Sequence, residues 1–305
     1  MRPTDHPTNE DLFAGNPSRK TQHLSIAENR LVKQISMLVT DHSNLNSGLS
    51  GTMKLKPAVL SFSAAERAHM VREYYKGYSS RLGREMEALI FGHAGLPVVV
   101  FPTSCGRFFD FEDRGMVAAL AGKIDAGQLQ LTCVDSVDAE SWYNRTHAPR
   151  WRITRHLRYE EYLLHELLPL IRERNFDPRL LSLGCSFGGY HAVNIALRHP
   201  DVFTGFLSLS GAFDLKSFLG GYYDQECYYN LPTHYLPNLT DPWFLDRFRQ
   251  NRYVLATGHD DQCLAQNQAL DRILSDLQIP HQLHIWDATN SHDWPTWQRM
   301  VAEYL

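Results

Sequence analysis

Ser186 is the residue in this sequence whose surroundings best suit nucleophilic chemistry, because it stands between Gly184 and Gly188 in the pattern G-x-S-x-G. Residues 180–183 form an apolar run typical of a buried strand, and the sequence from Phe187 onward has the spacing of a helix. A serine on so sharp a strand-to-helix turn lies in strained backbone against neighbouring chain, so its flanking positions need to lack a Cβ. The segment therefore predicts a nucleophile elbow. The alternative is a turn serine without a chemical role.

A histidine able to activate this serine follows the last predicted strand, residues 282–286. A serine hydroxyl is a poor nucleophile until an imidazole accepts its proton. His281 and His284 lie at the edge of that strand or within it, whereas His292 lies in the loop beyond its end. We expect His292 to be the base and its neighbour Asp293 to cap the helix that follows.

Two adjacent carboxylates, Asp260 and Asp261, follow the predicted strand at residues 253–257. An imidazole base needs a carboxylate to fix its tautomer and to stabilise its protonated form. Serine, aspartate and histidine then occur in the chain order of α/β-hydrolases. Both aspartates could instead be solvated turn residues, or could form a metal site with His259 and Cys263. No further ligand stands at a suitable spacing, so we expect no metal.

An acyl-transfer site also needs backbone N–H groups that stabilise a developing oxyanion. We expect one from Phe187 and the other from the loop after the predicted strand at residues 97–102, with Ser104 as the preferred donor. Cys105 is the alternative donor. If the loop has no catalytic role, it is an ordinary tight turn. Cys185, next to the serine, is expected to be a small buried side chain that points away from the substrate.

The elements that must position these groups alternate along the chain. Such alternation predicts an α/β fold, a mainly parallel sheet with helices on both faces in three layers, preceded by antiparallel strands around residues 74–78 and 86–91. The other strands are expected at residues 97–102, 129–134, 180–183, 206–209, 253–257 and 282–286. Helices are expected at residues 116–121, 155–174 with a kink at Pro169, 187–198, 264–277 and 296–305.

The composition excludes several classes of partner. The 305 residues carry a formal net charge of −4, which provides no basic field for nucleic acid. No apolar run is long enough to span a membrane. The five cysteines lack a disulfide spacing and the N-terminus has no signal core, so a cytoplasmic location is expected. The sequence does not indicate an oligomeric state.

Residues 1–55 differ in texture from the rest, with many proline, serine, threonine and asparagine residues. We expect a mostly disordered extension, followed by a single catalytic domain at residues 56–305. Residues 24–40 have helical apolar spacing. They would form either a transient helix or one that docks on a partner or a membrane surface.

From about Val71 to Leu305 the sequence resembles the "Putative esterase" family of the α/β-hydrolase fold, which includes S-formylglutathione hydrolases of the esterase D type and mycolyltransferases. The resemblance rests on four segments, at residues 101–104, 184–189, 258–261 and 292–295. It implies a triad of Ser186, Asp261 and His292 without a cofactor, since relatives place the acid three residues after the glycine. The loop after residue 102 departs from the family because it lacks the His-Gly of many relatives.

These observations together predict a serine carboxylesterase that acts on small-molecule esters through an acyl-enzyme intermediate. Transfer of the acyl group to another acceptor would use the same triad, provided water is excluded. A non-catalytic binding protein of the same fold is the third reading. Residues 213–243, rich in tyrosine, would either cap the site or pack an irregular loop, and residues 135–143 are a second candidate wall.

Overall fold

A sheet of eight strands organises the computed structural model, which describes residues 70–287 and 292–305. Its spatial order is β1-β2-β4-β3-β5-β6-β7-β8. Strand β2 is antiparallel to both β1 and β4, and all later neighbours are parallel, which confirms the predicted mainly parallel α/β sheet. The strands are β1 (Arg72–Ser79), β2 (Arg84–Phe91), β3 (Leu96–Phe101), β4 (Leu129–Val134), β5 (Leu181–Cys185), β6 (Gly205–Leu209), β7 (Arg252–Gly258) and β8 (Gln282–Trp286).

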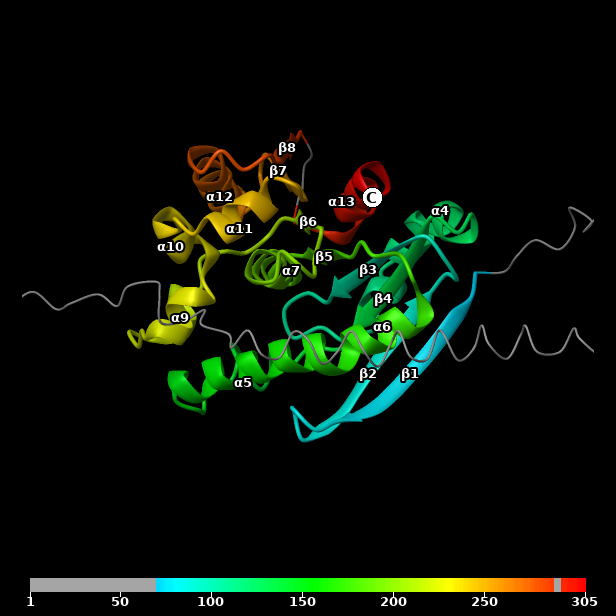
Figure 1. Cartoon of the computed structure of the whole chain (residues 1–305), viewed down its shortest axis with the longest axis horizontal. Coiled ribbons are helices and arrows are strands. Elements are labelled where there is room, and N and C mark those ends of the chain that lie inside the picture. Colours follow the sequence, from blue (N-terminus) through cyan, green and yellow to red (C-terminus); the bar gives the residue numbers. More distant parts are fainter. Residues whose placement is uncertain (1–69, 288–291) are drawn as a thin grey trace, which may run out of the picture. The chain divides into compact units, whose positions relative to one another are not determined.

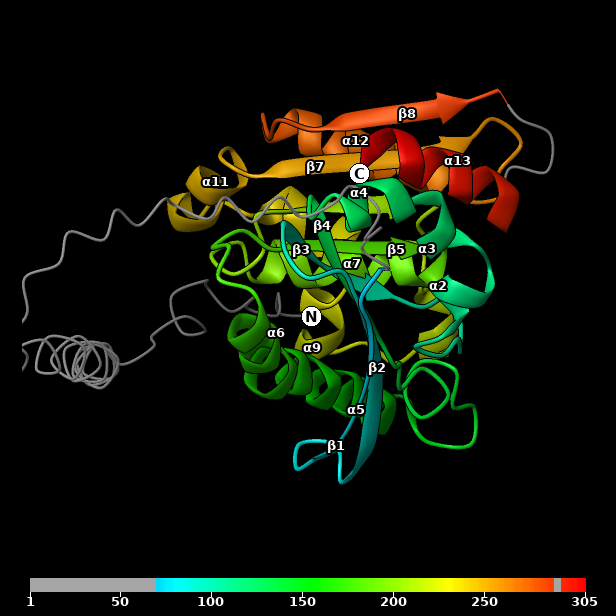
Figure 2. The same cartoon turned by 90° about the vertical axis from the view of Figure 1, so that its right-hand side faces the viewer.

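Helices cover both faces of the sheet (Figures 1 and 2). Before the elbow they are α2 (Asp110–Asp113), α3 (Met116–Ala119), α4 (Ala121–Asp125), α5 (Pro149–Tyr162), the π-helical turn η4 (Leu163–Leu167) and α6 (Leu168–Arg174). After it they are α7 (Phe187–Arg198), α8 (Lys216–Leu219), α9 (Gln225–Tyr229), α10 (Pro232–Tyr235), the 3₁₀ turn η5 (Leu236–Asn238), α11 (Pro242–Phe248), α12 (Leu264–Asp276) and α13 (Trp294–Tyr304).

The two faces of the sheet bury separate apolar cores. Side chains alternate along a strand, so Val99 and Phe101 of β3 pack with α5, α7 and α12, whereas Val98 and Val100 pack with α3, α4 and α13. A strand buried on both faces is apolar at most of its positions, and polar exceptions such as Ser182 and Ser208 are small. This burial explains the continuous apolar runs from which the central strands were predicted.

The long helix predicted at residues 155–174 differs from the observed one in start and in shape. It begins earlier, at Pro149. Proline suits the first helical turn because an N–H group there would have no acceptor within the helix. The irregular turn is η4 and comes just before Pro169 rather than at it. Proline cannot donate a bond to the carbonyl four residues earlier, so the distortion falls on the preceding turn.

Residues 213–243, predicted to be irregular, contain short helices α8, α9, α10 and η5 and the start of α11. Their starts are marked by side-chain caps from Asp224 and Asp241 and by the prolines Pro232 and Pro242. Helices of three to seven residues are too short to show apolar periodicity, which is why the sequence did not reveal them.

The predicted N-terminal extension at residues 1–55, its helix at residues 24–40 and the domain start at residue 56 lie outside the described residues, as do loop residues 288–291. Among the helices that are described, none has the length and apolar character needed to cross a bilayer. The cytoplasmic location stays a prediction.

Candidate active site

Ser186 forms a strained turn between the end of β5 and the start of α7. Its backbone angles are φ 56° and ψ −119°, a combination that non-glycine residues rarely adopt. The backbone holds it there, because Ser186 N–H donates to Leu209 O at 2.8 Å and Ala212 N–H donates to Ser186 O at 3.1 Å. The serine therefore stands at a fixed point above the end of β6.

The glycines on either side make this turn possible. A Cβ on Gly184 would lie 2.1 Å from Gly188 O, and one on Gly188 would lie 2.5 Å from Pro102 O. Both contacts are far shorter than van der Waals separation, so any side chain would force the elbow open. These are the close approaches that the G-x-S-x-G pattern predicts. The second also brings the start of α7 against the chain that leaves β3.

Ser186, His292 and Asp261 form a continuous hydrogen-bonded series. Ser186 Oγ lies 3.0 Å from His292 Nε2, and His292 Nδ1 lies 2.9 Å from Asp261 Oδ1. An ionised carboxylate only accepts hydrogen bonds, so Nδ1 carries the proton and Nε2 is left to accept from the serine. The Asp261 side chain is fully buried, while 21% of His292 is exposed. The arrangement can therefore take up a proton from Ser186.

The local electrostatics keep Asp261 ionised. Burial alone would raise the pKa of its carboxyl group, but the hydrogen bond from His292, the nearby Ser210 hydroxyl and the N–H of Cys263 outweigh this effect and lower the pKa. Asp260 is 64% exposed and pairs with His259 at 3.1 Å. Of the two candidate carboxylates, the fold thus brings Asp261 and not Asp260 to His292.

Helix α13 holds the histidine from the other side. As predicted, Asp293 caps the N-terminus of α13 by accepting a hydrogen bond from Thr296 N–H at 3.2 Å. The Trp297 ring stands edge-on to the His292 ring at 5.1 Å, and its Nε1–H donates to Ser210 Oγ at 2.9 Å. Sequence reasoning missed Ser210 and Trp297. Ser210 directly follows the predicted strand β6, so the strand-end argument that found Asp261 could have found it.

The two predicted oxyanion donors lie on segments that touch. Phe187 is the first residue of α7, and N–H groups at a helix start have no acceptor within the helix. Ser104 lies in the turn after β3, which Gly106 N–H closes on Thr103 O at 2.8 Å. The neighbouring Cys105 has φ 53° and is exposed. Cys185 is buried, as expected, and burial raises the pKa of its thiol.

Aromatic rings border this turn. The hydroxyls of Tyr143 and Ser104 are hydrogen-bonded at 2.7 Å, and the Tyr143 ring packs at 5.1 Å from Phe187 and 4.9 Å from Phe218. The Arg145 guanidinium lies 4.9 Å from the Phe218 ring centre. Each candidate wall segment thus contributes one aromatic ring beside the turn.

Much of the remainder of both segments has packing roles. In residues 135–143, Asp135 is buried against Arg107 at 2.7 Å and Asp138 against His191 at 2.8 Å. In residues 213–243, Tyr235 is buried in the core and Tyr228 and Tyr229 pack against it. These tyrosines therefore support the fold beside the site.

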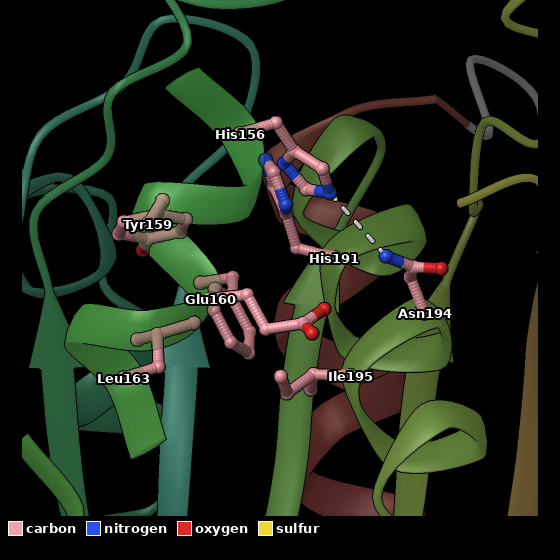
Figure 3. Close-up of a pocket in the computed structure, with 8 residues that line it drawn as sticks. His156, Tyr159, Glu160, Leu163, His191, Asn194 and Ile195 are labelled. Carbon is pink, nitrogen blue, oxygen red and sulfur yellow. Dashed lines mark hydrogen bonds between the residues drawn. The ribbon is translucent and has the colours of Figure 1, made fainter. Parts of the chain in front are cut away.

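A small cavity lies between α5 and α7, the helix that begins directly after Ser186 (Figure 3). His156 and Glu160 of α5 face His191, Asn194 and Ile195 of α7 across it. Its volume of about 10 Å³ has room for little more than one water molecule. Burial, and then the nearby His191, lower the pKa of His156 to about 3, so this imidazole stays neutral. The cavity is too small for an ester substrate.

Asp261, Cys263 and His292 also present three possible metal-ligand atoms within 4.8 Å of one another. Burial raises the pKa of the Cys263 thiol to about 12, so it would bind a metal only after losing a tightly held proton. Asp261 and His292 are already joined by a hydrogen bond. This donor set fits a hydrogen-bonded acid–imidazole pair better than a metal site.

Comparison with known proteins places this chain among esterases. The profile of the family described as "Putative esterase" matches residues 79–304. A search among curated proteins finds no significant match.

Similar solved structures include a ferulic acid esterase, with TM-score 0.63, 17% identity and coverage of 77% of this chain and 96% of that one. An S-formylglutathione hydrolase from Agrobacterium tumefaciens has TM-score 0.58 and 17% identity, with 77% and 93% covered. MPT51 (FbpC1) from Mycobacterium tuberculosis has TM-score 0.53 and 17% identity, with 76% and 96% covered. At such identities these likenesses show the fold, which is that of α/β-hydrolases.

Proposed function

The chain belongs to the "Putative esterase" family and is therefore a hydrolase of ester bonds, and on that premise we propose that it is a serine carboxylesterase that works through an acyl-enzyme on Ser186. The observation that carries the proposal is the series Ser186 Oγ, His292 and Asp261, with contacts of 3.0 and 2.9 Å. Donor and acceptor order in that series matches the order in which a proton must move.

The reaction divides into acylation and deacylation. Ser186 Oγ attacks the ester carbonyl while His292 Nε2 takes its proton, and the imidazolium returns the proton to the departing alcohol. Water then attacks the acyl-enzyme with His292 again as base, the bond between the acyl group and Ser186 Oγ breaks, and the imidazolium returns the proton to Oγ as the carboxylic acid leaves. Asp261 keeps the proton on Nδ1 and stabilises the imidazolium in both steps. His292 is partly exposed, so water can reach the proposed acyl-enzyme.

We assign the oxyanion hole to the N–H groups of Phe187 and Ser104, with Cys105 as the alternative second donor. Two features support this assignment. The Phe187 N–H begins a helix, where the dipole favours negative charge. The close approach of Gly188 to Pro102 O brings the chain that leads to Ser104 against the start of α7. The Tyr143 hydroxyl donates to Ser104 Oγ and fixes that side chain, so that the backbone remains available.

The substrate we propose is a small ester with an aromatic or short acyl group. Tyr143 and Phe218 offer ring faces next to the proposed oxyanion turn, and aromatic faces favour flat apolar groups. One structural neighbour is a ferulic acid esterase, whose named acid is aromatic. Hydroxycinnamate methyl esters therefore belong in the test panel beside p-nitrophenyl esters of increasing acyl length.

The test combines covalent labelling with turnover. A fluorophosphonate probe should label the wild-type protein and not Ser186→Ala, and the same substitution should abolish turnover of every ester in the panel. Equal labelling of the two proteins would show that the nucleophile is elsewhere. Addition of competing alcohols measures acyl transfer, and transesterified product as the main outcome would assign the protein to the acyltransferases instead.

A further inference from the structure

The carboxylate of Asp261 is satisfied on only one of its two oxygens. Oδ1 accepts from both His292 Nδ1 and Cys263 N–H, at 2.9 and 2.7 Å. Oδ2 is buried, and no residue in the described part of the chain completes a hydrogen bond to it in this arrangement. A buried carboxylate oxygen without a donor is strongly destabilising. A donor must therefore be supplied from close by.

Ser210 is the residue placed to supply it. It directly follows β6, the neighbour of the strand that leads to Asp261, and it is completely buried. Its backbone is held in a left-handed conformation, with φ 53°, by donation from its N–H to Ala256 O at 2.7 Å. The hydroxyl is close enough to contribute to the lowered pKa of Asp261.

Trp297 determines which way this hydroxyl can donate. Indole Nε1–H is a donor only, and it donates to Ser210 Oγ at 2.9 Å. The serine oxygen is therefore the acceptor in that bond, and its single O–H must point elsewhere. Asp261 Oδ2 is a buried acceptor that lacks a donor, and it belongs to the carboxyl group whose pKa the Ser210 hydroxyl helps to lower. A tryptophan thus selects the carboxylate as the target of the serine proton.

We propose that Ser210 and Trp297 are positioning residues for the acid of the triad: Trp297 orients the Ser210 hydroxyl, and that hydroxyl donates to Oδ2 of Asp261. The proposal rests on the proposed function, since it assigns these residues a role in the same reaction. Its consequence is that Oδ1 is held toward His292, because the opposite oxygen is anchored. Trp297 also packs edge-on against the His292 ring, so one side chain aligns both partners of the acid–base pair.

The variants that test this proposal are Ser210→Ala, Trp297→Phe and the double variant, with Trp294→Phe as the matched control. Trp297→Phe keeps an aromatic ring against His292 and removes only the N–H donor. Trp294 packs beside Trp297 at 5.1 Å on the same helix, but the hydrogen-bond series does not include it. We expect Ser210→Ala to lower kcat by roughly ten- to a hundredfold, the range for one hydrogen bond to a charged group. The KM of Ser210→Ala should change less than about threefold. The kcat of Trp294→Phe should stay within about twofold of the wild-type value, because this substitution removes no hydrogen bond of the series.

Two further readouts separate positioning from general destabilisation. If Trp297 acts through Ser210, then Trp297→Phe should have a much smaller effect on kcat in the Ser210→Ala background than in the wild type. Removal of a donor leaves more negative charge on the carboxylate facing His292, so the acid limb of kcat/KM should move to higher pH in Ser210→Ala.

A spectroscopic readout does not require activity. The proton shared by His292 Nδ1 and Asp261 should give a resonance far downfield in the ¹H NMR spectrum, and Ser210→Ala and Trp297→Phe should shift it while Trp294→Phe does not. Independent, additive losses or an unmoved resonance would overturn the positioning role. If wild-type protein shows no Ser186-dependent turnover, the proposed function fails, and the resonance still decides whether Ser210 and Trp297 orient Asp261.

Discussion

Asp261→Asn provides the sharpest test of the proposed acid, because the geometry predicts which way the new amide will face. In the wild type one oxygen, Oδ1, serves both His292 Nδ1 and the backbone N–H of Cys263. A backbone N–H cannot turn away, so the amide oxygen should occupy the Oδ1 position and the NH₂ should face Ser210. The Ser210 hydroxyl can rotate to accommodate it. The imidazole then keeps its proton on Nδ1, and only the negative charge is lost.

The size of the effect follows from that charge. Two unit charges about 4 Å apart interact by about 4 kcal/mol at an effective dielectric constant of 20, which is suitable for a buried carboxylate facing a partly exposed ring. Loss of this stabilisation of the imidazolium should lower kcat/KM about 10³-fold. Asp260→Asn is the matched control. Asp260 is exposed and pairs with the exposed His259, so its substitution should change kcat/KM less than about threefold, as for an exposed pair.

The assay is a pH profile of kcat/KM for a p-nitrophenyl ester. With the tautomer preserved and the charge removed, the imidazole loses a stabilising partner for its protonated form, so the acid limb of Asp261→Asn should move to lower pH. Activity that instead recovers steeply above pH 9 would indicate that the amide NH₂ faces His292 and has reversed the tautomer. A larger loss in Asp260→Asn than in Asp261→Asn would refute the assignment of the acid.

Three other outcomes are expected. The lowered pKa of Asp261 keeps this carboxyl group ionised in mildly acidic solution. The acid limb of the wild-type kcat/KM profile should therefore show a single ionisation in the range of imidazoles. A second step between about pH 4 and 5 would contradict this. Burial opposes ionisation of Glu160, but Arg198 and His199 outweigh this effect and lower its pKa. Glu160→Gln should therefore lower the free energy of unfolding by about 3 kcal/mol at pH 7. In urea unfolding this difference from the wild type should shrink as the pH falls below about 4.5, and a difference that stays constant would refute the ion pair as its source. A protein that begins at Lys54 should retain ester hydrolysis, because every proposed site residue lies between residues 104 and 297. Loss of folding in that protein would show that the extension contributes to the core.

The central sheet and the position of the serine could be predicted because both depend on local pattern. Continuous apolar runs mark strands that are buried on two faces, and the glycines flanking Ser186 reflect contacts within a few residues of it or with one adjacent strand end. The same argument located His292 and a pair of aspartates after strand ends. It could not choose between Asp260 and Asp261 from the residues alone, since that choice depends on the direction of a turn. The family resemblance supplied the preference for Asp261.

Ser210, Trp297 and the short helices after β6 were not predicted, for two different physical reasons. The hydrogen bond between Trp297 and Ser210 joins side chains 87 positions apart, and neither residue type signals it locally. Helices α8 to α11 are shorter than two full turns, so they carry caps and prolines but no periodicity. Residues that support a site from a distance in sequence are thus the ones that pattern reasoning misses.

The positions of the proposed catalytic groups depend on one another through the sheet itself. At the end of β5, Ser186 N–H donates to Leu209 O of β6. At the end of β6, Ser210 N–H donates to Ala256 O of β7, and at the end of β7, His259 N–H donates to Trp286 O of β8. The chain that leaves each of these strands is therefore still bonded to the next strand where it turns toward the site. Ser186 and Ser210, at the first two of these points, have positive φ values of 56° and 53°. Because sheet register fixes every step, a shift of β6 against its neighbours would displace the nucleophile and the support of the acid together. The sheet thus fixes Ser186 and Ser210 relative to the end of β7, from which the chain continues to Asp261.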